Sequence, residues 1–343
     1  MNEALTALGV SAPVLAAPMA GGPGTPALVV AAARAGGLGF LAGGYKDAGA
    51  LGEQIDQVRA GEVPFGVNLF APNPLPVDPA EFRRYARTIA PEGQAYGLDL
   101  LAAEAVEDDD HWSDKIELLL SRPVPVVSFT FAVPHPAVVR ALRAAGTLVV
   151  QTVTSPAEAL QAAEAGADML VVQASAAGGH SGTFTPRRSP ADVPLPRLLG
   201  EVADRVSLPL IGAGGLATPA DVVRALQAGA AAAMVGTVLL LADESGTSLP
   251  HKDALAGAAD RGTVVTRAFT GRPARALRNR FTDRYGDLAP FGYPALHHLT
   301  GPMRRAAAAA RDPERINLWA GTGHHHATPE PAARILRRLA SRL

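Results

Sequence analysis

Short runs of apolar residues alternate along the first 240 residues with longer segments in which apolar and polar positions mix. Continuous apolar runs are typical of buried strands in a parallel sheet, and mixed segments are typical of the helices that cover it. The apolar runs begin at residues 14, 38, 65, 124, 147, 169, 208 and 232. Eight strands in alternation with helices predict an α/β protein built as a closed TIM (β/α)8 barrel.

Residues that cap helix N-termini precede several of the mixed segments. Thr25, Asp47, Ser155 and Thr218 stand directly before such segments, and proline follows three of them. A capping side chain followed by proline at the first helical position is a typical helix start. The residues before position 14 carry no basic cluster, so we expect them to lead into the first strand and not to form a signal peptide.

Two segments interrupt the strand–helix alternation. Residues 71–112 are proline-rich and then acidic, and we predict an excursion from the barrel with a helix near 79–90. Its acidic run, 107–110, is interpreted as a solvated turn in preference to a cation site. We predict a barrel over 1–240, a small, mostly helical cap domain over 241–315, and a tail over 316–343 that packs back onto the barrel.

Composition narrows the classes of function. The 343 residues are 48% hydrophobic, carry a net charge of −1 and contain no cysteine. Near-neutral charge and 5% aromatic residues give no support to a nucleic-acid partner or an anionic membrane. The lack of cysteine excludes disulfides and thiolate chemistry. No apolar stretch reaches the roughly 18 residues of a membrane span, so we expect a cytoplasmic protein, compatible with a homodimer.

Glycine and polar residues follow the predicted strands where a barrel of this type holds its ligand. Gly214 and Gly215 follow the seventh strand, and Gly236 and Thr237 follow Met234 and Val235 of the eighth. Backbone N–H groups of two such loops would bind a phosphate, although glycines also serve simply to make tight turns. The predicted cofactor contacts from this pattern are Met19, Gly214, Gly215, Met234, Val235, Gly236 and Thr237.

A second group of candidates lies on the third and sixth strands. Asn68 and Gln173 are amides at strand ends that suit the polar edge of a flavin ring, or are satisfied core amides. Gly178 and Gly179 make a loop that a planar ligand can approach closely. The histidine that follows them, His180, is placed to exchange a proton near neutral pH.

Six motifs in chain order carry a resemblance to a known family. They are Pro18-Met-Ala-Gly-Gly, Gly36-Gly-Leu-Gly, Gly66-Val-Asn-Leu-Phe, Gln173 followed by Ala-Gly-Gly-His-Ser-Gly, Gly212-Ala-Gly-Gly and Val235-Gly-Thr. With them the chain resembles the nitronate monooxygenases, formerly called 2-nitropropane dioxygenases. The likeness extends to Thr270-Gly-Arg-Pro-Ala-Arg-Ala-Leu-Arg-Asn, Tyr293-Pro-Ala-Leu and Leu318-Trp-Ala-Gly.

The resemblance implies a TIM barrel that holds FMN and oxidises alkyl nitronates, such as propionate 3-nitronate, with O₂ to nitrite and a carbonyl compound. It implies that His180 is the catalytic histidine and that Tyr293 borders the substrate pocket. It also implies that FMN contacts Asn68, Gln173, Gly178, Gly215 and residues 234–237. Ala176, where the family carries an acid nearby, and Thr322, in place of its usual glutamine, bear on substrate preference.

Other interpretations remain open at this point. An FMN-dependent enoyl-[acyl carrier protein] reductase that uses NAD(P)H resembles the same glycine–histidine loop, and a non-catalytic flavin or phosphate binder would use the same scaffold. The arginine-rich run 267–284 is interpreted as a solvated, salt-bridged face in preference to an anion attractor. The histidine run 324–326 is interpreted as a surface loop, and we expect no metal site.

Overall fold

Eight parallel strands close into a barrel, as the sequence predicts. The computed structural model describes residues 2–188, 190–258 and 261–343. The barrel order is β1-β2-β3-β4-β5-β6-β8-β9, and β1 pairs with β9 to close it. The strands are β1 (Val14–Ala16), β2 (Gly39–Ala42), β3 (Phe65–Phe70), β4 (Val126–Thr130), β5 (Leu148–Val153), β6 (Met169–Gln173), β8 (Leu210–Ala213) and β9 (Ala232–Val235).

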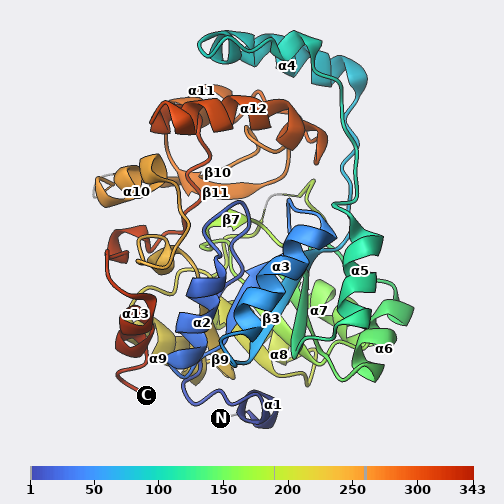
Figure 1. Ribbon diagram of the computed structural model, residues 1–343, viewed down its shortest axis with the longest axis vertical. Helices are drawn as coiled ribbons and strands as arrows, with labels where there is room; N and C mark the ends of the chain where they lie inside the picture. The colour runs from blue at the N-terminus through green and yellow to red at the C-terminus, as the bar shows by residue number, and fades with distance from the viewer. Residues whose placement is uncertain (1, 189, 259–260) are drawn as a thin grey trace.

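Helices surround the barrel on its outer face (Figure 1). The capping residues act as predicted: the Thr25 hydroxyl accepts from the Leu28 N–H, and Asp221 completes a capping box with Thr218. The helices of the repeat are α2 (Pro26–Arg34), α3 (Ala48–Arg59), α5 (Trp112–Ser121), α6 (Pro136–Ala144), α7 (Pro156–Glu164), α8 (Leu195–Ala203) and α9 (Pro219–Gln227).

Two helices, α1 (Glu3–Ala7) and α5, were not predicted from the sequence. α5 begins at the end of the segment that we assigned to the excursion. No sequence signal marks its start, because His111 at the N-cap adopts a left-handed φ of 55° and makes no capping hydrogen bond with its side chain. At the N-terminus, the expected lead into the first strand is wrong: Asn2 caps α1. Leu5 of α1 packs against the interior side chains Leu15 and Phe40 of the barrel. In Figure 1, α1 lies beneath the barrel, at the end opposite the cap.

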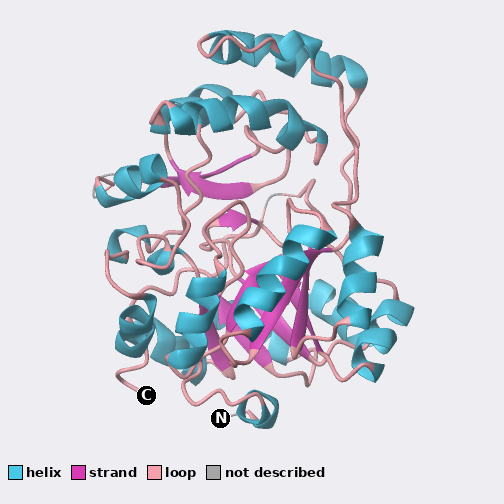
Figure 2. Ribbon diagram, viewed as in Figure 1, coloured by secondary structure: helices cyan, strands magenta, loops and turns pink. Residues whose placement is uncertain are grey.

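A cap covers the carboxyl ends of the strands, and beside its helices it contains a small sheet that the sequence analysis did not predict. Its helices are α10 (Leu249–Ala256), α11 (Arg280–Tyr285) and α12 (Ala295–Ala309). They lie over a three-stranded sheet of order β10-β11-β7, with β10 at Thr263–Thr266 and β11 at Ala274–Leu277 (Figure 2). The third strand, β7 (Gly179–His180), belongs to the loop after β6. A strand of two residues has no apolar alternation, and the sequence therefore did not reveal it.

The excursion joins the cap through α4 (Pro79–Gln94), which η1 (Leu100–Ala102) follows. Phe82 and Tyr85 of α4 share one apolar cluster with Phe281 and Leu296 of the cap. Figure 1 shows α4 lying across α11 and α12, far from the barrel. The domain limits at 240 and 315 remain a prediction. The contacts in this cluster show that α4 packs with the cap and not with the barrel.

The end of the chain lies beside the barrel. After η3 (Pro313–Arg315) and η4 (His324–His326), α13 (Ala332–Leu339) shares an apolar cluster with α2, η2 (Thr237–Leu239) and β1. Ile335 and Leu336 carry this contact. Within the described ranges, every helix falls short of the length and apolar character that a bilayer crossing requires.

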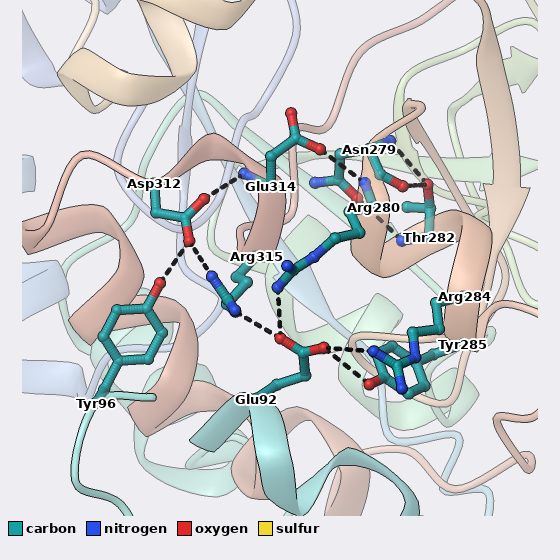
Figure 3. A network of polar contacts seen from close by, with 10 residues as sticks. All are labelled: Glu92, Tyr96, Asn279, Arg280, Thr282, Arg284, Tyr285, Asp312, Glu314 and Arg315. Carbon is teal, nitrogen blue, oxygen red and sulfur yellow. Dashed lines mark hydrogen bonds and ion pairs between the residues drawn. The ribbon is translucent and has the colours of Figure 1, made fainter. Parts of the chain in front are cut away.

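A buried carboxylate fastens α4 to the cap. Glu92 is only 3% exposed and accepts from Arg280 at 2.7 Å, from Arg315 at 2.5 Å and from the Tyr285 hydroxyl at 2.8 Å (Figure 3). The Arg284 guanidinium lies 3.5 Å away. Burial raises the pKa of Glu92, but the hydrogen bonds from Arg315 and Tyr285 and the charge of Arg280 outweigh it and hold the pKa below its usual value.

Removing this carboxylate should loosen the cap. We expect Glu92→Ala to lower the free energy of unfolding by about 3 kcal/mol, because three guanidinium groups lose their common partner. The pKa of Glu92 is lower in the folded than in the unfolded protein. The loss in free energy of unfolding is therefore fully present above pH 4.5, the usual pKa, and vanishes as the pH falls through the pKa of folded Glu92. Urea unfolding at several pH values measures it.

The matched control removes an exposed carboxylate from the same helix. Glu81 lies 3.9 Å from Arg84, and both side chains are about half exposed. Glu81→Ala should change stability by less than about 0.5 kcal/mol. Equal losses in the two variants would show that Glu92 is no clamp.

Candidate active site

A cavity of about 460 Å³ lies where the barrel strands end beneath the cap. Its volume is within the range of small-molecule and cofactor sites. The cavity walls bring together every predicted catalytic and cofactor-binding residue from the ends of five barrel strands and the loops that follow them. These residues are Met19, Asn68, Gln173, Gly178, Gly179, His180, Gly214, Gly215, Met234, Val235, Gly236 and Thr237.

Close backbone packing shapes one wall of the cavity. A Cβ on Gly178 would lie 2.5 Å from the backbone N of Gly321, and one on Gly214 would lie 2.8 Å from the Ala174 carbonyl oxygen. Gly214 and Gly215 adopt φ values of 101° and 76°, which side chains disfavour. The Gly321 N–H donates to the Thr237 hydroxyl at 2.9 Å. This wall is therefore a narrow backbone cradle formed by Gly178, Gly214 and Gly215.

Protein contacts hold both candidate amides in fixed orientations. The Asn68 amide nitrogen donates to the Ser128 hydroxyl at 2.9 Å and to the Thr130 hydroxyl at 3.0 Å. Its Oδ1 has no hydrogen bond within the described chain, and it remains free for a ligand donor. The Gln173 side chain accepts from the Gly182 N–H at 2.7 Å and donates to the His180 carbonyl at 3.3 Å. Gln173 thus also supports the loop that carries the histidine.

His180 lies between the barrel and the cap. As part of β7 it pairs with Ala274 of β11, and its Nε2 lies 2.9 Å from the Thr270 hydroxyl. Burial, followed by the charges of Arg272 and Arg304, lowers the pKa of His180 to about 3. The imidazole is therefore neutral at physiological pH. A neutral ring can accept a proton but carries no charge with which to hold an anion, so this environment disfavours an imidazolium as the anion-binding group.

Tyr293 contacts His180 and lies outside the described lining of the cavity. Its ring centroid is 5.9 Å from that of His180 and 5.6 Å from that of Phe131. Burial, followed by the neighbouring Tyr45, raises the pKa of Tyr293 well above its usual value. Its hydroxyl therefore stays protonated, and its ring packs edge-on against the ring of His180. The role in the substrate pocket remains a prediction.

Arg304 of α12 is a cavity residue that sequence reasoning missed. Its guanidinium donates to the Thr300 hydroxyl, to Asn317 Oδ1 and to the His297 carbonyl at 3.1, 3.1 and 3.0 Å. Within the described chain, no carboxylate lies within 4.0 Å of it. Burial lowers the pKa of Arg304 to about 10, so it stays charged at neutral pH. A single arginine in a helix gave no signal that it faced the site.

Arg272 corrects the solvated-face interpretation of residues 267–284. It is fully buried, donates to the Asn73 and Thr183 carbonyls, and lies over the Phe131 ring at 3.9 Å. Only part of the run, such as Arg278 with Asp283, forms exposed ion pairs. The charge stays inside because carbonyl oxygens and an aromatic face replace the water that a surface arginine would have.

Two smaller expectations also need correction. In the acidic run, Asp110 pairs at 2.8 Å with Lys115, which is only 1% exposed, so this end of the run is structural and not solvated. In the histidine run, His324 is buried, and its ring lies 3.3 Å from the Gly321 carbonyl. Among the described residues, no cluster of three or more histidine, aspartate or glutamate side chains has a metal-binding arrangement.

Comparison with known proteins agrees with the geometry. The family model described as nitronate monooxygenase matches residues 2–341. A protein of Staphylococcus aureus described as a probable nitronate monooxygenase is 32% identical over 100% of this chain and 97% of its own length.

Solved structures extend the comparison. A nitroalkane oxidase from Streptomyces ansochromogenes superposes with a TM-score of 0.92 at 43% identity, covering 99% of this chain and 97% of its own. FabK from Thermotoga maritima superposes with a TM-score of 0.77 at 27% identity, covering 99% and 95%. The overlap with the nitroalkane oxidase is therefore the stronger of the two in both fold and sequence.

The backbone cradle gives a direct test of the cavity. Gly178→Ala should weaken FMN binding about tenfold or more, because the added methyl group forces the loops at 178 and 321 apart by an amount typical of overpacking. Titration of flavin-depleted protein with FMN measures the dissociation constant. The control is Gly200→Ala in α8, where a Cβ meets no atom within 4 Å, and its binding should match wild type. Unchanged binding in both variants would place the phosphate elsewhere.

Proposed function

The chain belongs to the nitronate monooxygenase family, and from that membership we propose that it holds FMN in the cavity and oxidises alkyl nitronates with O₂ to nitrite and a carbonyl compound. The observation that carries the proposal is Arg304, which is charged and has no carboxylate partner among the described residues, in the wall of the cavity that His180 also lines. Propionate 3-nitronate is the substrate that we propose to test first.

The residues present fit FMN. The cradle of Gly178, Gly214 and Gly215 would hold the phosphate, and the free Asn68 Oδ1 would accept from the polar edge of the flavin ring. When bound, the flavin accepts electrons from the electron-rich nitronate, with O₂ as the final oxidant. The task of the protein is to bind and orient both molecules in a site from which water is excluded.

Arg304 accounts for the preference for an anion. A nitronate carries a full negative charge, and transfer into a cavity without a compensating cation would be costly. Arg304 supplies that charge, and three protein acceptors fix its guanidinium in place. Arg272 adds positive potential from behind His180. Small nitronates and O₂ are therefore the proposed partners, while a homodimer and a cytoplasmic location remain predictions from the sequence.

Removing this charge should weaken substrate binding. We expect Arg304→Met to raise the KM for propionate 3-nitronate about 10- to 100-fold with flavin content retained, as loss of a charged hydrogen bond would do. Arg278→Met, at an exposed arginine of the cap that lies outside the described lining of the cavity, is the control and should behave as wild type. An unchanged KM in flavin-replete Arg304→Met would remove Arg304 from substrate binding.

The activity itself has a simple assay. Purified protein should be yellow and should release nitrite from propionate 3-nitronate in air without NAD(P)H. A flavin that is reduced only by NAD(P)H, with no nitrite formed, would replace the proposal with an enoyl reductase. Protein that holds flavin and does neither would be a flavin-binding protein without this chemistry.

A further inference from the structure

The hydroxyl of Thr270 lies between the ring of His180 and the backbone of its own loop. Thr270 is 1% exposed, and its Oγ1 lies 2.9 Å from His180 Nε2. The same hydroxyl donates to the Arg272 carbonyl at 3.3 Å and accepts from the Arg272 N–H at 3.4 Å. Every neighbour of this hydroxyl therefore belongs to the histidine or to one short loop.

Counting protons on these atoms selects one form of the histidine. A hydroxyl has a single proton, and the buried Arg272 carbonyl can only accept. When the Thr270 hydroxyl donates its proton to the Arg272 carbonyl, the 2.9 Å hydrogen bond between Thr270 Oγ1 and His180 Nε2 requires Nε2 to be the donor. If Thr270 donated to Nε2 instead, the carbonyl would lose this donor, at the cost of a buried unsatisfied acceptor.

The other ring nitrogen is then the basic one. In a neutral imidazole only one nitrogen carries a proton, so Nε2–H leaves Nδ1 with a free lone pair. Nδ1 makes no hydrogen bond with any described residue, and His180 lines the cavity. We propose that Thr270 is a positioning residue that fixes the Nε2–H tautomer of His180, so that Nδ1 accepts a proton from a neutral nitroalkane bound in the cavity.

This inference rests on the proposed function and extends it to neutral nitroalkanes. The C–H bond next to the nitro group breaks, an N–H bond forms at His180 Nδ1, and the electron pair moves into the nitro group to give the nitronate. The step balances without an oxidant or a reductant. It creates an imidazolium beside an anion, and Arg304 in the same cavity stabilises that anion. A preformed nitronate bypasses the step entirely.

Other titratable groups also face the ring and shape its pH response. Arg272 follows Thr270 in the cap loop, Arg304 and His297 come from α12, and Tyr293 precedes that helix. Burial lowers the pKa of His297 to about 2, so it adds no charge near neutral pH. Thr270 carries no charge, and its replacement by valine alters none of these groups directly.

The test compares two substrates in Thr270→Val and Thr270→Ser. Valine keeps the shape but not the hydroxyl, and serine keeps the hydroxyl. With neutral nitroethane, kcat/KM should fall about 100-fold in the valine variant and recover largely in the serine variant, as loss of a general base would require. With ethylnitronate, both variants should remain within about threefold of wild type, because no proton is removed. Equal losses on the two substrates would overturn the proposal.

A second measurement is independent of turnover. Nitrogen-15 NMR of histidine-labelled protein, assigned with His180→Asn, should show the proton on Nε2 of His180 in wild type and in Thr270→Ser. Thr270→Val should lose this single tautomer. A proton on Nδ1 in wild type would overturn the inference even if the protein oxidises nitronates. The expected tautomer in a protein that releases no nitrite would place the failure in the proposed function instead.

Discussion

The pairing of β7 with β11 is the contact on which the site depends. Two residues of a barrel loop, Gly179 and His180, hydrogen-bond as a strand to Arg275 and Ala274 of the cap sheet. The barrel alone would leave this loop free at its carboxyl edge, where a TIM barrel holds its chemistry. The pairing fixes the histidine between the two parts of the molecule. The cavity is therefore a property of barrel and cap together.

The arginines of the cap fall into two groups, one paired with a carboxylate and one with neutral partners. Far from the barrel, the arginines around Glu92 converge on one buried carboxylate and hold α4 in place. Beside the cavity, the described partners of Arg272 and Arg304 are neutral: oxygen atoms, an aromatic ring and the His297 imidazole. A buried cation whose partners are neutral keeps its attraction for an incoming anion. Arginine thus holds a structural carboxylate in one place and, under the proposed function, the substrate anion in the other.

The neutrality of His180 follows from the same arrangement. Burial of the ring and the charges of Arg272 and Arg304 oppose its protonation, which keeps it as an acceptor at neutral pH. They also make the imidazolium costly unless an anion forms at the same moment. Proton transfer from a nitroalkane creates that anion, so the charges of the product compensate each other. The environment thus suits a proton transfer that produces a bound nitronate.

The sequence by itself determined the barrel and most of its ligand wall. Apolar runs, capping residues and strand-end glycines are local signals, and together with the family motifs they placed all eight strands and the twelve predicted residues that line the cavity. Only the tertiary structure determined which residues of the cap face the cavity or support His180. The contacts of Arg272, Arg304 and Thr270 with their partners depend on how the cap folds over the barrel. A single buried arginine or hydroxyl leaves no periodic pattern in the sequence, because its contacts are with residues that are far away along the chain.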